Sequence, residues 1–80
     1  METKIKTFIK KHYPTADITI NGIGEEDIHL EWNKIPKFNP KFMYGKLFKT
    51  FKNFEYIVVE GEWDTWVYTK TSLKYGEYYK

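Results

Sequence analysis

The first apolar residues of the chain are spaced as on one face of a helix. Ile5, Phe8 and Ile9 follow the i, i+3, i+4 rule, while the lysines around them point elsewhere. Pro14 disfavours helical geometry in the residue before it. The pattern therefore predicts a helix over residues 3–12.

Alternating apolar and polar residues then predict a β-hairpin. A first strand is expected from residue 16 to residue 20 or 23. The second strand is clearer, because Ile28, Leu30 and Trp32 alternate with polar residues.

The turn between these two strands is left open by the sequence. Asn21-Gly22 is a dipeptide typical of tight hairpin turns. A longer loop through residues 21–27 is equally consistent, because it holds a second glycine and three acidic residues.

A second helix is predicted after a short connector. Asn39 is a favoured N-cap residue, and Pro40 suits the first helical position, where no N–H is needed. From there to about Asn53 the residues divide between two sides of a helical wheel. The apolar side comprises Met43, Tyr44, Leu47, Phe48 and Phe51.

Two further strands are predicted near the end of the chain. They run from Phe54 to Glu60 and from about Asp64 to Ser72, with a tight turn at residues 61–62. Residues 73–80 form an aromatic tail to which the pattern assigns no structure.

This order of helix, hairpin, helix and hairpin defines the expected fold class. We predict a single α+β domain over residues 1–80, in an αββαββ arrangement with a four-stranded, mostly antiparallel sheet and two helices on one face. The tripeptide at residues 6–8, Lys-Thr-Phe, recurs at residues 49–51, which leaves open whether the two helix–hairpin units are a duplication.

Composition narrows the class of protein. With 41% hydrophobic and 20% aromatic residues the chain can form a core, and no uncharged apolar run approaches the ~20 residues of a membrane span. All thirteen basic residues are lysine, and residues with AT-rich codons are abundant, which indicates a bacterial, phage or mobile-element origin. Cysteine is absent and no signal peptide is visible, so we expect a cytoplasmic location.

Few residues are suited to catalysis. Ser72 is the only serine, and the two histidines are His12 and His29. His29 and Glu31 share a strand face, but no ligand spacing matches an EF-hand or a zinc site. We therefore expect no enzymatic activity, no metal and no cofactor.

Aromatic residues gather instead around the second predicted hairpin. If the helices cover one face of the sheet, we expect an apolar surface on the other, because both alternating sets of positions in residues 54–72 are apolar. Trp and Tyr dominate the energetics of protein interfaces. The expected partner-binding residues on this face are Tyr56, Val58, Trp63, Trp66 and Tyr68.

Acidic residues mark the turns of both predicted hairpins. If both turns lie at one end of the sheet, that end is negative and can steer a charged protein partner. The acidic residues are Glu25, Glu26, Asp27, Glu60, Glu62 and Asp64.

A basic face is expected on the second helix, opposite its apolar side. Lysines there can neutralise phosphates while an aromatic ring stacks on a base, so this face is a candidate for nucleic-acid binding that weakens strongly with salt. Its residues are Lys41, Phe42, Lys46, Lys49 and Lys52.

Together these features predict a small, non-enzymatic intracellular binding protein. Its expected mode of action is protein–protein contact with a host protein, as a phage- or mobile-element-like regulator or inhibitor. Two alternatives stay open. One is a nucleic-acid-binding module, and the other is a structural subunit of a homo-oligomer such as a homodimer.

Overall fold

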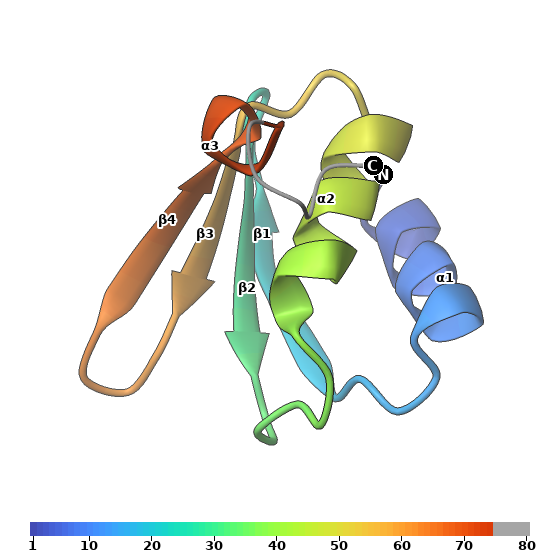
Figure 1. The fold of residues 1–80 in the computed structure, drawn as a ribbon, viewed down its shortest axis with the longest axis vertical. Helices are drawn as coiled ribbons and strands as arrows, with labels where there is room; N and C mark the ends of the chain where they lie inside the picture. Colours follow the sequence, from blue (N-terminus) through green and yellow to red (C-terminus); the bar gives the residue numbers. More distant parts are fainter. Residues whose placement is uncertain (75–80) are drawn as a thin grey trace.

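The computed structural model of this chain describes residues 1–74 and shows three helices and a four-stranded sheet (Figure 1). The predicted α+β class is confirmed. Most of the predicted aromatic tail, residues 75–80, lies outside the described residues. In chain order the elements are α1 (Glu2–His12), β1 (Ile18–Ile23), β2 (Asp27–Trp32), α2 (Pro40–Thr50), β3 (Tyr56–Glu60), β4 (Thr65–Thr69) and α3 (Lys70–Lys74).

The sheet is mixed, with its strands in chain order. β1 and β2 form one antiparallel hairpin and β3 and β4 form another, whereas β2 and β3 are parallel. A parallel pair needs a long crossover connection, which α2 supplies here. Because β2 and β3 run in the same direction, the turns of the two hairpins lie at opposite ends of the sheet (Figure 1).

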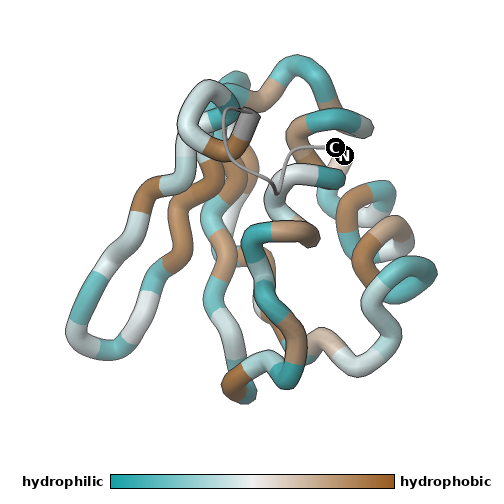
Figure 2. Tube along the Cα trace, in the orientation of Figure 1, coloured by the Kyte–Doolittle hydropathy of each residue, from teal (hydrophilic) through white to brown (hydrophobic). Residues whose placement is uncertain are grey.

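Strand alternation decides which side chains face the helices. Ile28 and Leu30 of β2 pair with Ile57 and Val59 of β3, and all four are buried. Figure 2 shows hydrophobic residues within the strands and polar residues around the β3–β4 turn. The helices close the same core with Ile5 and Ile9 from α1 and Met43, Tyr44, Leu47 and Phe48 from α2.

The sequence left the turn of the first hairpin open, and the structure excludes a turn at Asn21-Gly22. Both residues lie inside β1, where the register shifts between Ile20 and Gly22. Such a bulge adds one residue to a strand and increases its twist without reversing the chain. The reversal follows at residues 24–26, and there the Gly24 N–H donates to the carbonyl oxygen of Asp27 at 2.8 Å.

The last predicted strand is too long. β4 ends at Thr69, and residues 70–72 begin α3 instead. The Ser72 N–H donates to Thr69 Oγ1 at 3.1 Å, and the Ser72 hydroxyl donates to the Thr69 carbonyl oxygen at 3.0 Å. Thr69 thus caps α3 in the manner typical of hydroxyl residues, and Leu73 enters the core. The predicted αββαββ arrangement therefore omits α3, and the observed order of elements is αββαββα.

No helix among residues 1–74 is long and apolar enough to cross a membrane.

Candidate functional site

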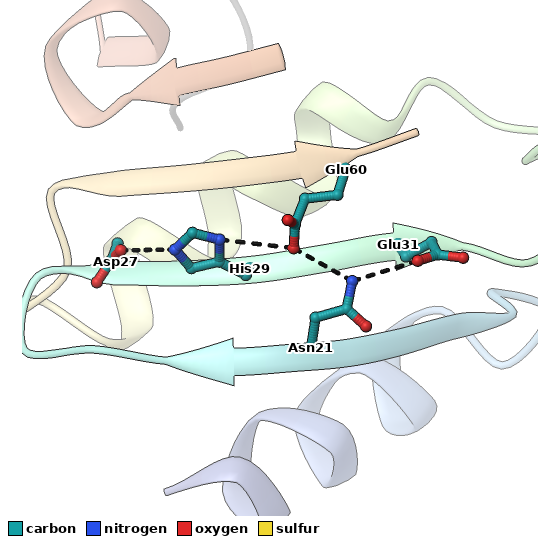
Figure 3. Close-up of polar contacts among 5 residues, drawn as sticks. All are labelled: Asn21, Asp27, His29, Glu31 and Glu60. Atoms are coloured by element: carbon teal, nitrogen blue, oxygen red, sulfur yellow. Dashed lines mark hydrogen bonds and ion pairs between the residues drawn. The ribbon is translucent and has the colours of Figure 1, made fainter. Parts of the chain in front are cut away.

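A polar network lies on the sheet face opposite the helices (Figure 3). His29 of β2 is at its centre, with Nε2 2.6 Å from Asp27 Oδ2 and Nδ1 3.5 Å from Glu60 Oε1. The Asn21 amide donates to Glu60 Oε1 at 3.2 Å and to Glu31 Oε1 at 3.3 Å. These side chains come from β1, β2 and β3, so they link the two hairpins across the parallel strand pair.

This network has the properties of a polar cluster on the surface of the sheet. The His29 and Asp27 side chains are each about one-third exposed, and solvent-accessible pairs of this kind contribute about 0–1 kcal/mol. In residues 1–74 the hydrogen-bond partners of His29 include no hydroxyl or thiol that it could activate as a nucleophile. The same residues hold no group of three or more His, Asp or Glu side chains arranged for a metal ion.

The acidic residues of the two hairpin turns do not form one negative end. Glu25 and Glu26 are exposed at one end of the sheet, and Glu62 and Asp64 are exposed at the other. The parallel pairing of β2 and β3 separates them. The two remaining predicted acidic residues, one from each hairpin, meet at His29 in the network described above.

The prediction of a single aromatic sheet face is wrong, because the five residues assigned to it lie on three different parts of the surface. Trp66 and Tyr68 pair with core residues of β3, so their side chains lie on the helix side of the sheet. Tyr56 and Val58 alternate with those core residues and lie on the open face beside the polar network. Trp63 lies in the β3–β4 turn.

Trp66 and Tyr68 line a groove of about 370 Å³ on the helix side of β4. Tyr44 of α2 also lines it, accepting a hydrogen bond from Trp32 Nε1 at 2.8 Å. The Tyr44 and Tyr68 rings are tilted against each other, with 4.8 Å between their centroids. Burial raises the pKa of Tyr44 to about 12, against a smaller lowering by the Trp32 hydrogen bond, so its hydroxyl is neutral at physiological pH.

The rim of this aromatic groove is open to solvent. Ile35 is 93% exposed and Trp66 is 51% exposed. Lys34 is the only charged side chain among the described residues that line the groove. The sequence signal for this rim is the apolar Ile-Pro pair at residues 35–36, in the connector before the second predicted helix.

A second cleft, of about 460 Å³, lies between α1 and β1. Its lining is aliphatic and polar, with Lys6, Lys10 and Asp17 among its residues, and no aromatic side chain among the described ones. Interfaces draw most of their binding energy from aromatic and arginine anchors. The aromatic groove is therefore the stronger candidate for a contact site.

The lysines predicted to bind nucleic acid are distributed along α2 and the turn after it. Lys46 is exposed, with its Nζ 5.4 Å from the centroid of the Tyr13 ring. Lys52 follows the helix, and its carbonyl oxygen accepts a hydrogen bond from Lys70 Nζ at 2.7 Å. Nucleic-acid binding stays a prediction. The other members of the set, Lys41, Phe42 and Lys49, lie on α2.

No protein-family model, curated protein or solved structure matches this chain. The fold and its surface define the class of protein: a small α+β domain with an aromatic groove beside an outer strand of its sheet.

Proposed function

We propose that this protein acts by binding another protein, without catalysis, and that the partner inserts an apolar side chain into the aromatic groove beside β4. The observation that carries the proposal is the groove itself. Trp66 is half-exposed at its rim, beside Tyr68 and above a hydrogen-bonded Trp32–Tyr44 pair.

The groove has the physical properties of an interface centre. Its aromatic side chains offer a large contact area and have few torsions to immobilise on binding. The Trp32–Tyr44 hydrogen bond and the contact between the Tyr44 and Tyr68 rings hold the lining in place before a partner arrives. A preorganised lining reduces the entropy lost on association, which favours tight binding.

The charge at the rim of the aromatic groove favours a partner segment that carries an acidic residue. Lys34 contributes a positive charge beside the exposed Ile35, and no described acidic residue lines the groove. An apolar side chain flanked by a carboxylate would therefore meet complementary chemistry. The AT-rich residue composition supports the narrower proposal that the partner is a host protein regulated or inhibited by a phage- or mobile-element-like factor.

The test is affinity capture from cells, followed by calorimetry with the purified partner. Trp66→Ala removes the half-exposed anchor while leaving the backbone pairing of β4 intact. Loss of a central aromatic anchor costs about 2 kcal/mol or more, so we expect binding to weaken at least ~30-fold.

Tyr56→Ala is the matched control. Tyr56 is a comparably exposed aromatic residue, but it lies on the open face of the sheet. We expect this variant to bind the partner like the wild type. The proposal fails if Trp66→Ala and Tyr68→Ala both retain the partner while circular dichroism shows that they are folded.

A further inference from the structure

β4 is an outer strand of the sheet, and its backbone bonds to β3 fix which groups point outward. At the two ends of the β3–β4 ladder, the Gly61 N–H donates to the Asp64 carbonyl oxygen and the Lys70 N–H donates to the Glu55 carbonyl oxygen. Hydrogen-bonded pairs alternate along an antiparallel ladder. Residues 66 and 68 therefore bond to β3, and residues 65, 67 and 69 direct their backbone groups to the open edge.

Within residues 65–69, β4 carries none of the residue types that usually protect an outer strand. Natural edge strands carry charged residues, proline or a bulge, which prevent pairing with another chain. β4 reads Thr-Trp-Val-Tyr-Thr, without charge or proline, and its register with β3 is uninterrupted. Val67, at its centre, is 57% exposed.

The residue types of β4 read the same in both directions about Val67: threonine, aromatic, valine, aromatic, threonine. A two-fold antiparallel interface places each position opposite its mirrored position on the identical copy, so threonine meets threonine, an aromatic ring meets an aromatic ring and valine meets valine. Pairing with an unrelated strand gives no reason for this symmetry.

We propose that two copies of this protein pair antiparallel along β4, with the two-fold axis at Val67, so that the two sheets become one continuous sheet. Val67 then faces Val67 of the second copy, and each exchanges its outward N–H and carbonyl groups with the other. The Thr69 N–H reaches the Thr65 carbonyl oxygen of the second copy, and Trp66 lies opposite Tyr68. Aromatic, threonine and β-branched pairs of this kind stabilise antiparallel sheets.

Charges beyond the strand ends agree with the same register. The next positions outward bring Asp64 of one copy opposite Lys70 of the other, which are oppositely charged. In the single chain Lys70 contacts the Lys52 carbonyl oxygen and Glu55, and Asp64 is exposed in the turn. No like-charged residues face each other between positions 64 and 70.

The dimer goes beyond the proposed function and does not rest on it. It uses the backbone edge of β4, whereas partner binding uses the groove on one side of the strand. Pairing would place Trp66 of each copy beside Tyr68 of the other and so bring two grooves together.

A charge swap at the two-fold axis tests the pairing. Val67→Lys and Val67→Glu each place like charges opposite each other, so each variant alone should associate at least about tenfold more weakly than the wild type. An equal mixture of the two variants places Lys opposite Glu and should form a one-to-one heterodimer. Sedimentation velocity from about 10 µM to 1 mM measures all three samples.

The expected result is a wild-type dimer, two variants that each associate at least about tenfold more weakly, and a dimeric mixture. Tyr56→Lys adds a positive charge on β3 rather than on the outer strand, and this variant should dimerise like the wild type. Circular dichroism checks the fold of each variant. A monomeric wild type at the highest concentration overturns the inference, as does a mixture that stays monomeric. If the wild type is monomeric but Trp66→Ala still loses a partner, the dimer fails and the proposed function stands.

Discussion

Tyr44 connects the core of the domain to the aromatic groove. Its ring is almost fully buried, and its hydroxyl accepts the indole N–H of Trp32. The apolar spacing of α2 predicted the burial of this residue correctly. The hydrogen bond could not be predicted from the sequence, because it joins a helix to the end of a strand whose packing depends on the whole fold.

Tyr44→Phe should reduce the loss of folding stability that the protein shows at alkaline pH. The Tyr44 pKa is raised from 10.0 to about 12 in the folded protein, so its stabilising contribution is complete below pH 10 and is lost as the pH rises towards 12. The unfolded chain releases this proton first. Urea unfolding across that pH range should show a steeper loss of stability for the wild type than for Tyr44→Phe.

At neutral pH the same substitution should cost about 1 kcal/mol, because it leaves the Trp32 N–H without its partner. Tyr56→Phe, on the open face, is the control. It should change neither the stability at neutral pH nor the loss of stability at alkaline pH. Parallel alkaline profiles for the wild type and Tyr44→Phe would show that Tyr44 is not the buried group described here.

The individual elements were predictable to different degrees. α1, β2 and α2 follow clear periodicities, and the Asn39 cap is confirmed by the hydrogen bond from the Lys41 N–H to its side-chain oxygen at 3.1 Å. The bulge at Asn21 was not predictable, because Asn-Gly is also a strong turn signal. In β3 both alternating sets of positions are largely apolar, so only the pairing of the strands decides which set faces the helices.

α3 is the element that the sequence pattern missed, and its contribution to the core is testable. Leu73 is 4% exposed within the main cluster. Leu73→Ala should lower the free energy of unfolding by about 2–5 kcal/mol, because it removes buried methyl groups and leaves a cavity. Thr71→Ala, at an exposed position of the same helix, should stay within about 0.5 kcal/mol of the wild type in urea unfolding. Equal effects for the two variants would mean that α3 does not pack on the core.

At the scale of the whole molecule, the parallel pairing of β2 and β3 determines what each face of the sheet carries. It separates the two hairpin turns and brings Glu60 of β3 to His29, which already lies beside Asp27 on β2, so the centre of the open face is polar. The exposed aromatic surface therefore lies beside β4, where the aromatic groove adjoins the outer edge of the sheet. The sequence analysis placed Trp66 and Tyr68 on the face opposite the helices, whereas they lie on the helix side of the sheet.

The proposed pairing of two copies along β4 can be followed by backbone amide hydrogen exchange, measured by NMR as the protein concentration is raised. The outward amides of Thr65, Val67 and Thr69 should exchange freely in dilute solution and become protected as the chains pair. Equally fast exchange at these three amides at every concentration would contradict the pairing of two copies along β4.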